Sequence, residues 1–594
     1  MKRQLIGVGV GLFMAFTAAA KDPAAAAIAS AHPLATQAGR EIIDAGGNAF
    51  DAAIAVAAAL AVVEPYSSGI GGGGFFLIHR SVSNSDNLID ARERAPLAAT
   101  KDMYLDAKGE VIAGKSVNGA LAAGIPGTPA ALVHLALYYG RLPLDRSLAP
   151  AIKLAREGFA ITAHYRTMAG FRKSVMASDP ATAHIFLDKN DVPALGYLLK
   201  QSDLADTLQH LALEGTAGFY AGPVADQLIA GVTAGGGIWK LEDLTQYKVV
   251  EREPMHGVYH DMEIVSAPLP SSGGIVLLEA LNILERYKLT DESALNRYHL
   301  VIEAMRRAYR DRAEYLGDPD FTTAPIATLI DKAHATEISA NISPDKATPS
   351  SSLKAVTPPK QGDHTTHFSI LDAEGNRVGA TLSINLPFGA CFTPRGTGVL
   401  LNNEMDDFSS RPLTPNAFGL VGADANAIGP GKRPLSSMAP TFLVTKDRIG
   451  ILGTPGGSRI ISMVLLGALE FYAGTEPAAW VRVPRYHHQY LPDEVLYEPA
   501  AFDEATRAAL AARGHQLHLS DRDYGNMQAI LWNRTTDIVT AASDPRGEGA
   551  AVVWAAKLPE IKEPAALPTA RTPEVAPLPK TLSNPPAPEP VLAH

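Results

Sequence analysis

A glycine run between two apolar segments is the feature that most constrains how this chain of 594 residues can fold. Residues 51–63 are mostly alanine and other apolar types, which predicts a buried helix. Glycines stand at 69 and 71–74, and large apolar residues at 75–78 then predict a strand. A dinucleotide-binding glycine motif would lead into a helix. We therefore interpret the run as a place where backbones pack closely, which glycine allows.

Mixed helices and strands are predicted along most of the chain. An amphipathic helix is expected at 36–45 and another helix around 295–316. Residues 341–362 are rich in Ser, Thr, Pro and Lys without an apolar period, so we expect an exposed linker. A hairpin follows, with strands at 366–370 and 378–384.

The two ends of the sequence have compositions of their own. Residues 1–20 combine a basic start, a short apolar run and small residues before Ala20, which is typical of a secretory signal peptide. The apolar run is too short for a stable membrane span. We therefore expect a periplasmic or secreted protein with no membrane span after signal removal. Residues 558–594 are rich in proline and poor in large apolar groups, which predicts a disordered tail.

Charge and cysteine content exclude several classes of protein. The chain has 52 Lys and Arg against 62 Asp and Glu, a formal net charge of −10. This balance argues against nucleic acid as a partner. The single cysteine, Cys391, excludes an intramolecular disulfide framework and any multi-cysteine metal site.

The junction between the linker and the hairpin contains the candidate nucleophile. It reads Gly-Asp-His-Thr-Thr-His over residues 362–367, and the hairpin places Thr365 opposite residues 383–385. Because side chains alternate along a strand, Ser383 and Asn385 fall on the face beside Thr365. Composition alone favours the interpretation of Thr365 as an ordinary strand residue whose hydroxyl is solvated.

Many separate strings, in the same order, closely resemble the γ-glutamyltranspeptidases (glutathione hydrolases), a family of the N-terminal-nucleophile hydrolase superfamily. The resemblance covers about residues 25–555. The strings that carry it lie at residues 90–93, 125–128, 270–274, 316–319, 364–367, 401–408, 432–438, 453–459 and 544–546.

The resemblance implies a fold, a maturation step and a reaction. The fold would be a four-layer αββα sandwich of the α/β (α+β) class. The precursor would cleave itself between His364 and Thr365 into a large subunit, 21–364, and a small subunit, 365–594, whose catalytic part is 365–557. The two subunits would form a heterodimer that cleaves the γ-glutamyl amide of glutathione and related compounds. The acyl group would pass through a threonine ester to water or to an amino acid or peptide, with no metal or organic cofactor.

The resemblance also assigns catalytic roles. Thr365 would be the nucleophile, and its new α-amine, with a reference pKa near 7.7–8.0, suits a base at neutral pH. Ser383 would supply a second hydroxyl beside the nucleophile. Backbone N–H groups of Gly456 and Gly457 would form the oxyanion hole.

A further set of residues would read the γ-glutamyl head. Arg92, Ser436 and Ser437 correspond to the set that binds its α-carboxylate, for which the arginine fork is suited. Asn385, Glu404 and Asp407 correspond to the set that accepts from its α-ammonium. Nothing near Asp407 in the sequence suggests another cation for it.

Two other functions remain open at this point. One is a cephalosporin or glutaryl-type amide acylase of the same superfamily, whose acyl groups lack the α-amine; the presence of Asp407 disfavours it. The other is a non-catalytic secreted binding protein, which the presence of Thr365 disfavours. Two positions depart from the family pattern: Ala91 replaces an aromatic residue, and Phe418 replaces a tyrosine in a lid segment, 412–423.

Overall fold

The computed structural model describes residues 22–353, 365–409 and 424–556. The predicted signal peptide, His364, the lid segment with Phe418 and the tail lie outside these residues. Among the described helices, none combines the length and the apolarity needed to cross a membrane.

Two large antiparallel sheets form the centre of the fold. In spatial order, the seven-stranded sheet consists of β18 (Ala550–Trp554), β1 (Ala26–Ser30), β9 (Thr366–Leu371), β10 (Arg377–Ser383), β2 (Gly73–Arg80), β3 (Ser85–Ala91) and β6 (Val250–Arg252). The six-stranded sheet consists of β17 (Ile538–Ser543), β16 (Gln528–Asn533), β12 (Arg448–Gly453), β11 (Thr441–Val444), β8 (Met262–Ser266) and β7 (Met255–Tyr259). Short strands pair elsewhere: β4 (Phe159–Ala160) with β5 (Leu198–Leu199), and β14 (Val495–Tyr497) with β13 (Tyr486–His487) and β15 (Leu517–Leu519).

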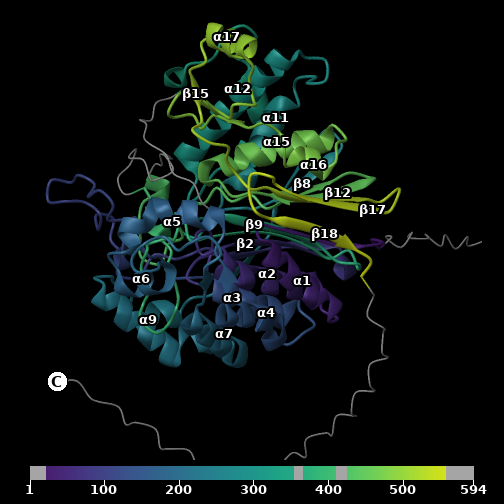
Figure 1. Cartoon of the computed structure of the whole chain (residues 1–594). Helices are drawn as coiled ribbons and strands as arrows, with labels where there is room; N and C mark the ends of the chain where they lie inside the picture. The colour runs from purple at the N-terminus through teal and green to yellow at the C-terminus, as the bar shows by residue number, and fades with distance from the viewer. Residues whose placement is uncertain (1–21, 354–364, 410–423, 557–594) are drawn as a thin grey trace, which may run out of the picture. The chain divides into compact units, whose positions relative to one another are not determined.

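Helices cover the outer faces of both sheets (Figure 1). Those before residue 250 are α1 (Pro33–Asp44), α2 (Ala49–Val63), α3 (Thr128–Tyr138), α4 (Leu144–Glu157), α5 (Ala163–Met176), α6 (Pro180–Phe186), α7 (Ser202–Glu214), α8 (Ala217–Tyr220), α9 (Gly222–Ala234) and α10 (Leu241–Thr245). The others are α11 (Gly273–Leu284), α12 (Ala294–Tyr315), α13 (Ile326–Leu329), α14 (Lys332–Ser339), α15 (Ile460–Tyr472), α16 (Pro477–Trp480) and α17 (Glu504–Ala512).

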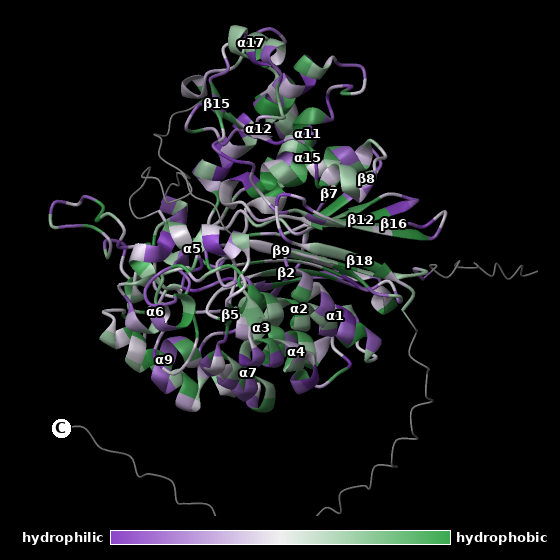
Figure 2. Ribbon diagram, viewed as in Figure 1, coloured by the Kyte–Doolittle hydropathy of each residue, from purple (hydrophilic) through white to green (hydrophobic). Residues whose placement is uncertain are grey.

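Side-chain alternation along the strands builds the layers. On β2, Phe75 and Leu77 join the apolar core that includes Phe442 of the six-stranded sheet. Phe76 and Ile78 point the other way and join the core that includes α2. The apolar residues of α2, and those of β12 above it, are visible as green ribbon in Figure 2. Because each sheet buries both faces, the arrangement is an αββα sandwich, which confirms the predicted fold class.

The glycine run packs backbone against backbone, as the sequence predicts. An added Cβ at Gly71 would lie 2.1 Å from the carbonyl oxygen of Leu400, and one at Gly72 would lie 2.1 Å from that of Ser383. Any side chain at these positions would push apart the segments that meet there. The preceding helix α2 begins with a capping box, in which Asn48 accepts from the N–H of Asp51 and the Asp51 carboxylate accepts from the N–H of Asn48.

The predicted hairpin is formed by β9 and β10, with Thr366 opposite Leu382. The next pair along this register is Thr365 and Ser383, so the predicted neighbourhood of the candidate nucleophile is confirmed. Strand β10 ends at Ser383. The chain then turns at Asn385, whose φ of 76° is in the left-handed region.

The predicted exposed linker is wrong at part of residues 347–350, whereas most other described residues of the segment are exposed or half-buried. In residues 341–353, Thr348 and Ser350 are buried. The N–H of Thr348 donates to Glu303 (3.1 Å), and that of Ser350 donates to Asp493 (2.7 Å). This segment packs through polar contacts to α12 and to the loop containing Asp493, which an apolar periodicity cannot reveal. Residues 354–362 lie outside the described part of the chain.

Candidate active site

Thr365 lies at the start of β9 with its side chain almost fully enclosed. The residue is 6% exposed, and its Oγ1 lies 3.4 Å from Oγ of Ser383. Ser383 Oγ in turn accepts a hydrogen bond from the backbone N–H of Asn385 (2.8 Å). The two hydroxyl groups predicted to act together are therefore neighbours, and the turn after β10 orients the second one.

Two hollows meet at Thr365. The smaller has about 300 Å³ of space, part of it open to solvent, and contains all the predicted substrate-binding residues. Its lining includes Arg92, Thr365, Ser383, Asn385, Glu404, Asp407, Ser436, Ser437 and Gly457. The larger has about 830 Å³ of space, likewise partly open to solvent, and its lining includes Glu64, His164, Thr365, Gly456, Arg522, Tyr524 and Arg546. We name them the head hollow and the outer hollow.

Arg92 is the central cation of the head hollow. It follows directly after β3, and its side chain is fully buried. Its guanidinium donates to Glu404 (2.7 Å) and also to Asp407. Asp407 therefore has a cationic partner within the protein, which corrects the expectation that no cation lies near it. The sequence could not show this pair, because the two residues are 315 positions apart.

Carboxylates outnumber the guanidinium in this hollow. Glu93 lies 3.5 Å from Arg92, and burial raises the pKa of Glu93 to about 7 against the lowering effect of Arg92. Burial also raises the pKa of Glu404, with a further contribution from Glu93 and Asp407. Oε1 of Glu404 and Oδ1 of Asn385 are buried and have no hydrogen-bond partner among the described residues. These acceptors suit a ligand that brings N–H donors and positive charge.

Two consecutive serines complete the head hollow. Ser436 Oγ accepts from the N–H of Met438 (3.1 Å), and Ser437 Oγ accepts from the guanidinium of Arg312 (3.1 Å). Arg312 is buried on α12, and burial lowers its pKa to about 10. The sequence analysis missed Arg312, which sits in a helix rich in arginine; only the fold shows that it is aimed at the site.

The predicted oxyanion-hole glycines form the turn after β12. Gly456 has a φ of 144° and Gly457 a φ of 55°, conformations that favour glycine. An added Cβ at Gly456 would lie 2.5 Å from Cε of Met463. Gly457 lines the head hollow and Gly456 the outer hollow, so the turn lies between the two, beside Thr365.

Glu64 is a second residue that the sequence analysis missed. It follows α2, is 3% exposed, and accepts a hydrogen bond from the hydroxyl of Thr366 (2.6 Å). It lines the outer hollow together with Thr365. Burial raises the pKa of Glu64 to about 8, with a smaller contribution from Glu548. The signal in the sequence that could have identified Glu64 was its carboxyl group, which stands directly after an apolar helix.

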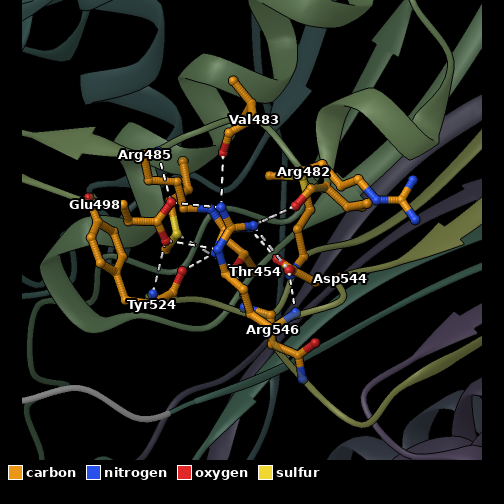
Figure 3. Close-up of polar contacts among 12 residues, drawn as sticks. Thr454, Arg482, Val483, Arg485, Glu498, Tyr524, Asp544 and Arg546 are labelled. Atoms are coloured by element: carbon orange, nitrogen blue, oxygen red, sulfur yellow. Dashed lines mark hydrogen bonds and ion pairs between the residues drawn. The ribbon is translucent and has the colours of Figure 1, made fainter. Parts of the chain in front are cut away.

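A network of arginines and carboxylates supports the outer hollow (Figure 3). Arg546 makes a two-pronged contact with Glu498, at 2.8 and 2.6 Å. Arg485 donates to Asp544 and to the carbonyl of Tyr524. Because Tyr524 and Arg546 both line the hollow, these ion pairs fix its wall.

The fold and this site together define a class of protein. A threonine at the start of a buried strand, in an αββα sandwich and beside a second hydroxyl, is typical of the N-terminal-nucleophile hydrolases. The model of the family described as gamma-glutamyltranspeptidase matches residues 35–554, and the chain belongs to this family.

Comparisons with individual proteins agree with the family. The glutathione hydrolase proenzyme of Pseudomonas sp. (strain A14) is 45% identical over 495 residues, which cover 82% of this chain and 86% of that protein. The proenzyme of the same description from Escherichia coli (strain K12) is 41% identical over 527 residues, covering 87% and 90%. Among solved structures, the cephalosporin acylase from Bacillus halodurans superposes with a TM-score of 0.78 at 30% identity, covering 89% of this chain and 96% of that one.

Proposed function

We propose that this chain is a self-processing γ-glutamyl hydrolase and transferase that uses Thr365 as its nucleophile. The observation that carries the proposal is the position of Thr365 Oγ1, 3.4 Å from Ser383 Oγ and at the edge of a hollow containing Arg92 and Asp407. The substrates would be glutathione and related γ-glutamyl amides. Two relatives described as glutathione hydrolase proenzymes support this choice.

Maturation would begin within the single chain. Thr365 Oγ1 would attack the carbonyl carbon of His364, the peptide C–N bond would break, and the Thr365 nitrogen would take up a proton as its new α-amine. Water would then hydrolyse the resulting ester and release the His364 carboxylate. The products would be the subunits 21–364 and 365–594, which stay together because β9 and β10 of the second pair with β1 and β2 of the first.

The α-amine would then serve as the base in turnover. It would take the proton from Thr365 Oγ1 as this oxygen attacks the γ-amide carbon, and the leaving amine would receive that proton. The N–H groups of Gly456 and Gly457 would stabilise the oxyanion. The acyl ester would finally pass to water or to the amine of an acceptor.

Recognition of the γ-glutamyl head would involve an exchange of ion pairs. Arg92 now donates to Glu404 and Asp407. A bound substrate would offer its α-carboxylate to Arg92, Ser436 and Ser437. Its α-ammonium would meet Asp407, Glu404 and the unpartnered amide oxygen of Asn385. Each charged group would keep a partner throughout, which limits the desolvation cost.

The outer hollow is the candidate site for the leaving group and the acceptor. It shares Thr365 with the head hollow and lies on the far side of the glycine turn. Arg522, an exposed cation stacked over the ring of Phe171, lies in its lining. Peptide leaving groups and amino-acid acceptors both carry a carboxylate, which this guanidinium would attract.

An amide acylase is the second candidate function, favoured by the similarity to a cephalosporin acylase. Such substrates lack the α-ammonium. The group of carboxylates around Arg92 favours the γ-glutamyl substrate instead. Export to the periplasm or the medium is part of the same proposal, supported by the composition of residues 1–20.

One experiment tests the proposal directly. Purified protein is assayed with γ-glutamyl-p-nitroanilide and, in parallel, run on a denaturing gel, and the smaller fragment is sequenced from its N-terminus. We expect two fragments, a small-fragment sequence beginning Thr-Thr-His, and release of p-nitroaniline. An uncut but active protein would remove Thr365 as the nucleophile. A cut protein that releases no p-nitroaniline from this substrate but does so from glutaryl-p-nitroanilide, assayed alongside it, would favour the acylase.

A further inference from the structure

Three helices in the outer layer over the six-stranded sheet bring two carboxylates and an imidazole together, outside the head and outer hollows. Glu279 lies on α11, Asp311 on α12 and His334 on α14. Nε2 of His334 is 3.0 Å from Oδ2 of Asp311 and 3.9 Å from Oε1 of Glu279. One ligand atom from each residue lies within 4.8 Å of the other two.

The carboxylates of this cluster are only partly paired by the described protein groups. The Glu279 side chain is 1% exposed, and neither of its carboxylate oxygens has a hydrogen-bond partner among the described residues. Asp311 is 2% exposed and accepts from Arg310, whose guanidinium also binds Glu314. Among the described residues, Glu279 and Asp311 therefore contact one imidazole and one guanidinium that is shared with another carboxylate. Buried carboxylates are normally paired or coordinate a cation.

We propose that Glu279, Asp311 and His334 bind a divalent transition-metal ion, with Zn²⁺ the best match. Zn²⁺ takes imidazole nitrogen and carboxylate oxygen at about 2.0–2.2 Å, so the ligand atoms of a tetrahedral site lie about 3.4 Å apart. The observed separations from the imidazole nitrogen, 3.0 and 3.9 Å, bracket this value. An imidazole ligand also disfavours Ca²⁺ and Mg²⁺, which prefer oxygen donors.

The site has a route for the ion and a structural consequence. His334 is 17% exposed whereas the two carboxylates are almost fully buried, so an ion can enter past the imidazole. Bound there, it would fasten α11, α12 and α14 to one another. Asp311 precedes Arg312, which donates to Ser437 of the head hollow. The ion would thus stabilise the helix that supports the substrate site, without taking part in the reaction.

A second cluster of similar composition differs from the first in how far its groups are already paired within the protein. His299, Glu303 and His515 also lie close together. Here Nδ1 of His299 is 2.8 Å from Nε2 of His515, and its other nitrogen is 2.8 Å from the Ser343 carbonyl. Glu303 is bound by Arg306 and Arg307. The protein itself satisfies His299 and Glu303, and only Nδ1 of His515 lacks a hydrogen-bond partner among the described residues. This cluster therefore carries no proposal.

The test measures metal binding by the full-length protein without an affinity tag. Protein stripped with EDTA is titrated with Zn²⁺ by calorimetry, metal content is measured after gel filtration, and Tm is recorded with Zn²⁺ and with EDTA. We expect one equivalent of Zn²⁺ per chain and a higher Tm, since an ion that binds only the folded state stabilises it. In Glu279→Gln and His334→Ala, affinity should fall at least tenfold and the Tm increase should disappear.

A matched control and two opposing outcomes make the test decisive. His210→Ala removes an exposed histidine that pairs only one described carboxylate, Glu214, and should leave Zn²⁺ binding unchanged. If wild type binds no stoichiometric Zn²⁺, Glu279 is instead a protonated carboxyl group held within the protein, and the proposal fails. It also fails if both variants bind Zn²⁺ as tightly as wild type. His334→Ala truncates a partly exposed side chain, so the test does not depend on Glu279→Gln folding.

Discussion

The guanidinium of Arg92 donates to the carboxylate of Asp407, although the two residues are expected to bind opposite ends of the same substrate head. In this structure, Arg92 and Asp407 therefore form an ion pair with each other. In the proposed binding mode, the substrate would exchange this ion pair for contacts to its own two charges, and these contacts would offset the cost of separating Arg92 from Asp407. A ligand that brings only a carboxylate would draw Arg92 away from Asp407 without bringing Asp407 a new cation. On this proposal the head hollow selects zwitterions.

Maturation depends on the hydroxyl of residue 365. In Thr365→Ala no oxygen can attack the His364 carbonyl, so we expect a single uncut chain and no turnover. Thr365→Ser keeps the hydroxyl and should still be cut. A denaturing gel with N-terminal sequencing reads both results. Cleavage of the alanine variant at the same bond would show that another group performs the attack.

The exchange of ion pairs predicts a change of selectivity in Asp407→Asn. The variant loses a charge-assisted contact worth about 1.5–3 kcal/mol, which is roughly a tenfold to more than a hundredfold fall in kcat/KM for γ-glutamyl-p-nitroanilide. For glutaryl-p-nitroanilide, which lacks the ammonium, activity should stay equal or rise, because Arg92 is released for the carboxylate.

Two checks accompany this measurement. The variant must be shown to mature, and Asp424→Asn, at an exposed carboxylate paired with Lys101, should leave both substrates unaffected. Equal losses on the two substrates in matured Asp407→Asn would mean that Asp407 supports the fold and does not read the amine.

Substitution of Arg522 should weaken binding of the acceptor and leave hydrolysis of the donor unchanged. Removing an exposed cation that attracts a carboxylate costs up to about 1 kcal/mol, so Arg522→Ala should raise the KM for glycylglycine roughly twofold to fivefold. Hydrolysis of γ-glutamyl-p-nitroanilide, whose leaving group has no carboxylate, should change little. Arg522→Lys keeps the charge and should recover most of the loss. An equal effect on hydrolysis would place Arg522 outside acceptor binding.

Because of Glu64, the free energy of unfolding should fall as the pH rises. Its pKa is about 8 in the folded chain against a reference value of 4.5. Between these values the unfolded chain loses the proton and the folded chain keeps it, so stability falls by up to about 1.4 kcal/mol per pH unit and then levels off above pH 8. Glu64→Gln removes this contribution.

Thermal unfolding at pH 5, 6.5 and 8 measures the effect, in the uncut Thr365→Ala background so that maturation does not intervene. The stability advantage of Glu64→Gln over its parent should grow with pH. Glu157→Gln, at an exposed carboxylate whose neighbour Lys153 keeps its charge across this range, should show no such trend. A constant difference across this range would mean that Glu64 ionises normally in the folded chain.

The linear sequence determined the local elements and the family. The hairpin of β9 and β10 follows from alternation and turn residues, so the pairing of Thr365 with Ser383 could be predicted. The glycine run marked close packing because only glycine tolerates it. The family motifs, which occur in a fixed order, predicted the site residues. Every predicted site residue within the described part of the chain lies around the two hollows.

Tertiary structure alone decided the partners of the charged groups. The cation on Asp407 comes from 315 residues away, and Arg312 and Glu64 reach the site from helices whose sequences look merely charged or merely apolar. Within residues 341–353, Thr348 and Ser350 are buried through polar contacts that produce no apolar periodicity. Periodicity records which face of an element meets apolar surroundings, whereas the partner of a buried charge depends on which distant element is packed against it. That choice is made only when the layers assemble.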